Sequence, residues 1–274
     1  MDESMRAHLY DWGMLTQAQR NQRYNNSEAV ANSQAIVAEM REASAKVRAE
    51  NPEGLDQPYG EGERRKIDFF PGAEAASPCL FFIHGGYWQR NSREGFSVLG
   101  LGVRAHGWSV SMPSYTLTPD GTMTNIVDEM RMALDWTRAR VQGPIIVSGW
   151  SAGGHLTAMV LGHPAVHAGL AISGIFELGP VRDTYLNDKA RITDAEIDML
   201  SPLRHPVVPK PLSIAYGSGE LPPLVGDSRA LHEKRAAAHV PGALIPGPGD
   251  DHFTIVGSLR HPTGLLTRAL LDLV

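Results

Sequence analysis

The sequence predicts an α/β fold in which a mainly parallel, twisted sheet of about eight strands carries helices on both faces. Short, continuously apolar runs recur along the chain, as is typical of strands buried on both faces. Helical segments separate these runs, and one run turns abruptly into a helix at a serine placed between glycines. At 274 residues the chain is long enough to form one large domain of this class.

The first expected element is a helix over residues 27–49. Ser27 is a suitable N-cap, and Ile36, Met40 and Val47 fall on one apolar stripe at helical spacing. A stripe of this kind indicates that the helix lies on the main domain.

The strands and helices of the sheet-forming region follow in alternation. Apolar runs predict strands over residues 66–70, 80–83, 108–112, 145–148, 170–173, 212–216 and 243–245. Helical patterns lie between them, over residues 93–106, 124–141, 152–162, 228–239 and 263–273. The second of these helices is clearly amphipathic, with Ile126, Met130 and Leu134 on one face.

Composition shifts along the chain suggest where its parts begin. Residues 51–62 are rich in turn-forming residues, so we expect residues 1–63 to be a helical segment that packs on the core or forms part of a lid. Residues 64–274 are expected to form the core domain. Within it, residues 177–210 fit no simple strand and helix unit, and we expect a cap-like insertion there that roofs the active site.

The overall charge argues against a polyanion partner. Lys plus Arg number 25 against 30 Asp plus Glu, which gives a net charge of −5, so nucleic acid is not expected to bind. Three of the opening six residues are charged, and no stretch reaches the roughly 18 apolar residues of a membrane span, so we expect a cytoplasmic location without a membrane partner. Cys79 is the sole cysteine and lies in an apolar run, where it should pack as a small apolar residue.

The most informative motif is Gly149-Trp150-Ser151-Ala152-Gly153, between an apolar strand and a helix. The pattern is typical of a nucleophile elbow, a strained turn that leaves little room for side chains other than that of the nucleophile. Ser151 is therefore the candidate nucleophile.

A serine hydroxyl needs a base to take its proton and a carboxylate to orient that base. In hydrolases with such an elbow, the acid and then the histidine follow the serine along the chain. His252 lies in the loop between the last predicted strand and the terminal helix, and is the candidate base. Glu220, in the loop after the strand at 212–216, is the candidate acid, with Asp227 as the alternative.

Donors for a developing oxyanion are expected from a second glycine-rich turn. His84-Gly85-Gly86 follows the strand at 80–83, and paired glycines let backbone N–H groups approach a substrate oxygen. Ala152 would supply a further N–H, and His84 is expected to brace the loop. Tyr87 and Trp88 either wall the substrate pocket or pack in the core.

No metal or cofactor site emerges from the sequence. The histidines lack the H-E-x-x-H spacing of a zinc site, and the glycine-rich turn lacks the signatures of phosphate or dinucleotide binding. We therefore expect a small-molecule substrate to be the partner, and the sequence leaves a homodimer open.

The chain resembles the α/β-hydrolase superfamily and, within it, the group of kynurenine formamidases (arylformamidases) and esterases. The resemblance covers nearly the whole chain and rests on HGGYWQ at 84–89, GWSAGGH at 149–155, His252-Phe253, Tyr24-Asn25-Asn26 and Tyr59-Gly60. It implies an α/β-hydrolase fold with Ser151 as nucleophile and His252 as base. It also implies an oxyanion hole around Gly85, Gly86 and Ala152.

The chain departs from the family pattern near the acid. Glu220-Leu221-Pro222 stands where the family commonly has an aspartate followed shortly by a proline, and either carboxylate can orient an imidazole. Pro222-Pro223-Leu224 replaces the family's usual Pro-Glu-Phe, which alters the local pocket.

The resemblance implies three functions to be compared. The first is a metal-free serine hydrolase that removes a formyl group from an aryl amine such as N-formylkynurenine, and the second is a carboxylesterase on small acyl or aryl esters. A catalytically silent binding protein is the third. An amino-acid substrate would need a cation for its carboxylate, for which Arg90, Arg182 and Arg191 are candidates by loop position.

Overall fold

The computed structural model describes residues 12–274, which are built around an eight-stranded sheet. The strand order is β1-β2-β4-β3-β5-β6-β7-β8. The β1/β2 and β2/β4 pairs are antiparallel, and every pairing among the other strands is parallel. The predicted mainly parallel sheet is thus confirmed. Residues 1–11, with the charged opening of the expected N-terminal segment, lie outside the described part.

The strands lie close to the predicted ranges. They are β1 (Gln57–Pro58), β2 (Lys66–Phe70), β3 (Cys79–Ile83), β4 (Ser109–Pro113), β5 (Ile145–Trp150), β6 (Val166–Ile172), β7 (Leu212–Gly217) and β8 (Leu244–Gly247). Only β1 was not predicted, because two residues in a turn-rich segment carry no periodic signal.

The α-helices are α2 (Gln17–Arg23), α3 (Asn26–Ala29), α4 (Ser33–Glu50), α5 (Leu101–Arg104), α6 (Met123–Arg138), α7 (Ala152–Val160), α8 (Gly179–Arg182), α9 (Asn187–Ala190), α10 (Asp194–Leu200), α11 (Pro222–Ala237) and α12 (Leu265–Leu271). Short 3₁₀ turns are η1 (Pro52–Gly54), η2 (Arg93–Gly95), η3 (Ser97–Gly100), η4 (Pro202–Arg204) and η5 (Ile255–Arg260).

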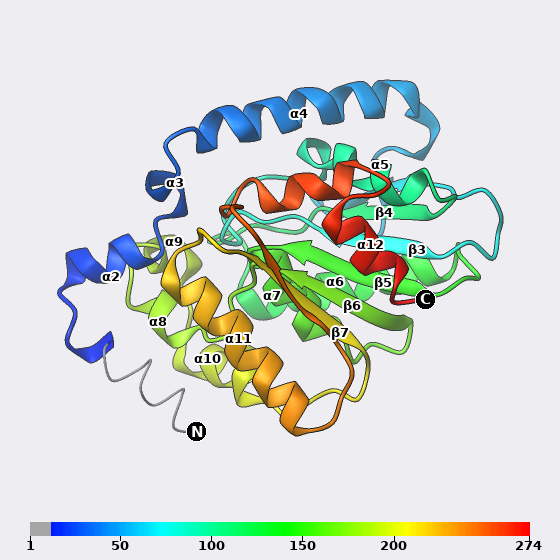
Figure 1. The fold of residues 1–274 in the computed structure, drawn as a ribbon. Coiled ribbons are helices and arrows are strands. Elements are labelled where there is room, and N and C mark those ends of the chain that lie inside the picture. The colour runs from blue at the N-terminus through cyan, green and yellow to red at the C-terminus, as the bar shows by residue number, and fades with distance from the viewer. Residues whose placement is uncertain (1–11) are drawn as a thin grey trace.

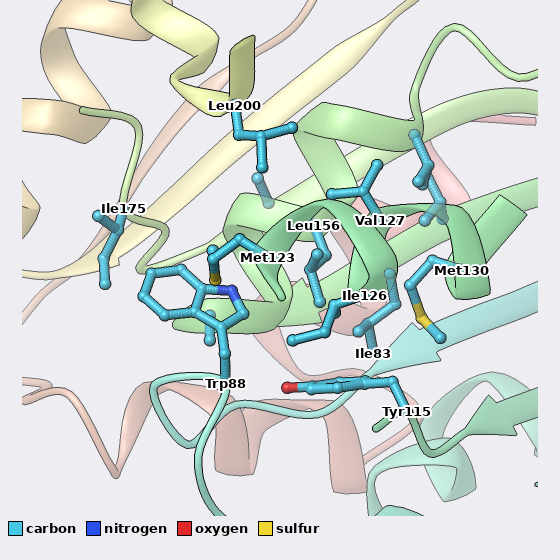
Figure 2. Close-up of a cluster of buried hydrophobic side chains, with 14 of the residues drawn as sticks. Ile83, Trp88, Tyr115, Met123, Ile126, Val127, Met130, Leu156, Ile175 and Leu200 are labelled. Atoms are coloured by element: carbon cyan, nitrogen blue, oxygen red, sulfur yellow. The ribbon is translucent and has the colours of Figure 1, made fainter. Parts of the chain in front are cut away.

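Two hydrophobic clusters cover the two faces of the sheet, because successive side chains of a strand point to opposite faces. In β3, Phe81 belongs to one cluster and Phe82 to the other. Residues of α6, α7 and α11 pack on the first face, and residues of α4, α5 and α12 pack on the second. Figure 1 shows α4 as the outermost element above α5, and Figure 2 shows the first face, with side chains of α6 and α7 packed together.

The predicted helix over 27–49 is divided in two. Asn25, rather than Ser27, caps α3 by accepting a hydrogen bond from the Glu28 N–H at 3.3 Å. Val30 is extended, which ends α3 before α4 begins at Ser33.

The other helices differ from their predictions mainly at their ends. The segment at 93–106 forms η2, η3 and α5 rather than one helix, and a side chain on Gly100 would lie 3.0 Å from Val110 of β4. The glycine thus lets this segment approach the sheet closely. Helix α11 begins at Pro222, six residues before the predicted 228, since proline suits the first turn of a helix.

Across the described part of the chain, every helix is too short or too polar to cross a bilayer.

Candidate active site

Ser151 lies at the sharp turn between β5 and α7, with φ of 60° and ψ of −118°. Its backbone N–H donates to the Ile172 carbonyl at 2.8 Å, which ties the turn to β6. A Cβ on Gly149 would lie 2.4 Å from the Gly153 carbonyl oxygen, and one on Gly153 would lie 2.0 Å from that of Ile83. Only glycine fits at both positions, so the local geometry is that of a nucleophile elbow.

Glu220 and His252 come from the loops after β7 and β8 and meet in a buried pair. Glu220 Oε2 lies 2.9 Å from His252 Nδ1, and the exposed fractions of the two side chains are 0% and 4%. An ionised carboxylate can only accept, so Nδ1 is the donor and the other ring nitrogen, Nε2, is left as a proton acceptor.

The second oxygen of Glu220 is held as firmly as the first. Ser173 Oγ donates to Oε1 at 2.5 Å, and the Gly217 N–H donates to it at 2.6 Å. These bonds compensate the buried charge and fix the carboxylate plane. The histidine is anchored as well, because Trp150 Nε1 donates to the His252 carbonyl at 2.8 Å.

The loop after β3 lies against the elbow. A Cβ on Gly85 would be 3.1 Å from the Ser151 Cβ and 2.7 Å from the Trp150 carbonyl oxygen. Gly86 has φ of 121° and Tyr87 has φ of 51°, so the loop turns through the left-handed region. Within residues 12–274, no hydrogen bond involves the backbone N–H groups of Gly85, Gly86 and Tyr87, and the Ala152 N–H begins α7 without an intrahelical partner.

His84 braces this loop rather than facing the cavity. Its Nδ1 lies 2.9 Å from the Gly85 carbonyl oxygen, and its ring stacks between those of Tyr115 and Phe96 at centroid distances of 4.3 and 5.9 Å. Burial lowers the pKa of His84 to about 4, so the ring is neutral near pH 7.

A cavity of about 550 Å³ is lined by both Ser151 and His252. Its size suits a small molecule. Residues of α3 and α4 between positions 26 and 41 line this cavity, whereas no residue of 177–210 does. The insertion therefore does not form the roof expected from the sequence.

Comparisons with known proteins agree with this architecture. Residues 67–167 match the family model described as BD-FAE, a range that includes the loop after β3 and the elbow. A candidate thioesterase from Silicibacter sp. is 24% identical with a TM-score of 0.82, covering 92% of this chain and 98% of that one. Esterase B from Lactobacillus rhamnosis, solved with a tributyrin phosphonate, is 18% identical with a TM-score of 0.68, covering 90% and 94%.

The chain has the α/β-hydrolase fold.

Two relatives by sequence are a kynurenine formamidase and an esterase. Kynurenine formamidase of Danio rerio is 26% identical over 259 residues, which cover 88% of each chain. Esterase LipC of Mycobacterium tuberculosis is 25% identical over 75% of this chain and 61% of its own.

The structure separates the two candidate acids, Glu220 and Asp227. Asp227 does not contact His252; its carboxylate instead accepts from the N–H groups of Phe176 and Glu177 at 2.6 and 3.1 Å. Burial raises the pKa of Asp227 to about 7. Glu220 is therefore the acid that the fold brings to the histidine.

The two aromatic residues after the glycines, Tyr87 and Trp88, have different surroundings. Tyr87 lines the cavity, whereas Trp88 is fully buried, does not line it, and packs edge-on against His155 at 5.2 Å between centroids. Figure 2 shows Trp88 among Ile175, Met123 and other core side chains. Of the two alternatives for Trp88, a pocket wall that binds substrate or core packing, the structure shows core packing.

Sequence reasoning missed Ser173 and Asn91, and it named Asn26 only as part of the family resemblance without a role. Ser173, with φ of 51°, directly follows β6 and holds Glu220. Asn91 Nδ2 donates to the Gly85 carbonyl at 3.1 Å, and Asn26 Nδ2 donates to the Tyr87 hydroxyl at 2.8 Å. The position of Ser173 at the carboxyl end of a strand was a usable signal, whereas the two asparagines act through contacts that only the folded chain creates.

Among residues 12–274, no group of three or more His, Cys, Asp or Glu side chains is arranged to hold a metal ion.

Proposed function

We propose that this chain is a serine hydrolase that cleaves a small acyl group, formyl in the first instance, from an aryl amine. The observation that carries the proposal is the buried Glu220–His252 pair, whose histidine lines the same cavity as Ser151. Formamidase relatives that align over most of the chain support the choice of a formamide.

The proposed reaction needs only side chains and backbone of this chain. Ser151 Oγ attacks the substrate carbonyl as His252 Nε2 takes the hydroxyl proton, and Glu220 stabilises the imidazolium. The carbonyl oxygen becomes an oxyanion that the N–H groups of Ala152 and of the Gly85–Gly86 loop stabilise. His252 then protonates the departing amine.

Water completes the cycle by attacking the acyl-enzyme. His252 takes a proton from the water and returns it to Ser151 Oγ as the acyl–oxygen bond breaks. The products are the free amine and the carboxylic acid, which is formate when the acyl group is formyl.

A carboxylesterase on small acyl or aryl esters is the second candidate, supported by the esterase relatives. Both reactions pass through an acyl-enzyme and differ in the leaving group. The test is to compare kcat/KM for N-formylkynurenine with kcat/KM for 4-nitrophenyl acetate and butyrate. A higher value for the formamide supports formamidase activity, and equal or better ester turnover contradicts it.

We further propose that residues 24–41 act as a lid whose base is fastened to the oxyanion loop. The Tyr87 hydroxyl donates to the Tyr24 carbonyl at 2.5 Å and accepts from Asn26 Nδ2 at 2.8 Å, and all three residues are buried. Tyr87 thus joins the segment that covers the cavity to the loop that carries the N–H donors.

Replacing Tyr87 with phenylalanine tests this connection. The change leaves a carbonyl and an amide buried without their partner, so we expect the free energy of unfolding to fall by about 1–3 kcal/mol. We also expect kcat to fall about fivefold to tenfold, since oxyanion donors stabilise the transition state more than the bound substrate. Denaturant unfolding and steady-state kinetics measure the two effects.

Tyr24→Phe is a matched control, because the Tyr24 hydroxyl is buried without a partner among residues 12–274. Its kcat should stay within about twofold of the wild type, since no hydrogen bond is lost. Equal kcat values for wild type and Tyr87→Phe would contradict the proposal that Tyr87 positions the oxyanion loop through its bonds to residues 24–41.

A further inference from the structure

The cavity carries positive charge without a negative counterpart. Two arginines, Arg41 and Arg90, line it, and among residues 12–274 no aspartate or glutamate does. The other polar residues that α3 and α4 contribute to the lining, Asn26, Ser27, Ser33 and Gln34, are uncharged. This contrasts with the chain as a whole, whose net charge is −5.

Neither arginine is neutralised by a carboxylate within residues 12–274. Arg41 Nη2 donates to the side-chain oxygen of Asn91 at 2.9 Å, and the Arg90 guanidinium makes no hydrogen bond or ion pair there. Nearby Arg48 and Arg93 are different, because both contact Asp56 and Asp68. No ion pair joins Glu28 to either arginine, and its carboxylate accepts from Asn25 Nδ2 at 2.6 Å.

Both arginines are tied to the loop beside Ser151. Asn91, which holds Arg41, donates to the Gly85 carbonyl at 3.1 Å. The Arg90 N–H donates to the Gly86 carbonyl at 3.0 Å. The Arg41 guanidinium and the Arg90 backbone are therefore held beside the loop that contacts the elbow, and both residues are exposed.

We infer that Arg41 and Arg90 form an anion subsite, and that the substrate is an ester or amide that carries a carboxylate away from its scissile bond. The inference rests on the proposed hydrolase function and adds the substrate class to it. A guanidinium presents paired N–H donors that match a carboxylate. Two guanidinium groups at a cavity rim that have no carboxylate partner also attract anions from solution. Of the arginines proposed from the sequence, Arg90 remains, whereas Arg182 pairs with Asp183 and Asp194, and Arg191 does not line the cavity.

The test uses two matched pairs of esters that differ in charge. In one pair the carboxylate is on the leaving group: 4-acetoxybenzoate against 4-acetoxybenzamide. In the other it is on the acyl group: 4-nitrophenyl hydrogen adipate against 4-nitrophenyl hexanoate. For at least one pair, kcat/KM of the wild type should be about tenfold higher for the charged ester, because exposed ion pairs contribute modestly to binding. The difference should lie in KM, and kcat should be the same for both esters of the pair.

The double variant Arg41→Gln/Arg90→Gln should lose this preference, so that its kcat/KM values for the charged and the neutral ester of each pair become equal. Raising the salt concentration to about 0.5 M should weaken the preference of the wild type, since salt screens exposed charges. Arg268→Gln is the control: it removes an exposed positive charge that lines a different cavity, beside β7, β8 and α12, and it should behave as the wild type does.

The anion subsite is overturned if neither pair shows a preference for the charged ester, or if the double variant retains that preference. In either case, hydrolysis of the neutral esters that requires Ser151 would leave the proposed function standing. No hydrolysis of the four esters or of N-formylkynurenine, or hydrolysis that persists in Ser151→Ala, would instead refute the proposed function.

Discussion

Ser151→Ala is expected to lower kcat by about 10⁴-fold to 10⁶-fold, the range found when the nucleophile of a serine hydrolase is removed. Alanine keeps the backbone of the elbow but has no oxygen to form the acyl-enzyme. The remaining rate would come from the oxyanion donors and from substrate binding alone. Single-turnover kinetics with a 4-nitrophenyl ester measure the loss directly.

Two further measurements show that the loss is chemical and not structural. A fluorophosphonate should add to Ser151 of the wild type and leave the variant unmodified, as mass spectrometry of the digested protein can establish. The midpoint of thermal unfolding should change little, because Ser151 is fixed by its backbone N–H, which alanine retains.

Ser228→Ala provides the matched control. Its hydroxyl is also buried, has no partner within residues 12–274, and does not line the cavity. We expect its kcat to equal that of the wild type. A Ser151→Ala protein that kept more than about one tenth of the activity would contradict the nucleophile role.

The sheet could be predicted from the sequence because its strands are buried on both faces. Cys79–Ile83 and Ile145–Trp150 are mainly apolar runs, and this pattern predicts a buried strand without knowledge of the rest of the fold. The elbow could also be predicted from the sequence. Glycine is required at 149 and 153 because a Cβ at either position would collide with backbone atoms. The two glycines on either side of the serine therefore form a short motif that can be recognised in the sequence.

The cover of the cavity could not be predicted in the same way. Residues 26–41 line the cavity through contacts with a loop some 60 residues away in sequence, such as the hydrogen bond between Asn26 and Tyr87. An apolar stripe shows that a helix packs on the protein, but not which part of the surface it covers. Trp88 illustrates the same limit, because an aromatic side chain suits a pocket wall and a core equally well.

The choice between Glu220 and Asp227 was a question of distance rather than of chemistry. Both are buried carboxylates near the carboxyl end of β7. The turn at Gly217–Glu220 directs one toward His252, and α11 carries the other to the backbone of Phe176 and Glu177. The sequence contains both residues but not the direction in which each side chain leaves its element.

Glu220→Gln is the second substitution with a large expected effect, a loss of about 10⁴-fold in kcat. In the wild type, Oε1 accepts from Ser173 Oγ and from the Gly217 N–H. The glutamine oxygen should keep this place, because its NH₂ group cannot accept from the Gly217 N–H. The NH₂ group is then directed at His252 Nδ1, where it can only donate.

This arrangement forces Nδ1 to be an acceptor and puts the ring proton on Nε2, so the imidazole can no longer take a proton from Ser151. The variant should therefore fold and bind substrate but fail in chemistry, with kcat reduced and the substrate dissociation constant unchanged. Asp227→Asn is the matched control, since it neutralises a second buried carboxylate that does not contact His252, and its kcat should stay within about tenfold of the wild type. If both variants lost activity equally, or if Glu220→Gln remained active, the 2.9 Å contact between Glu220 and His252 would be structural and the acid of the reaction would have to be sought elsewhere.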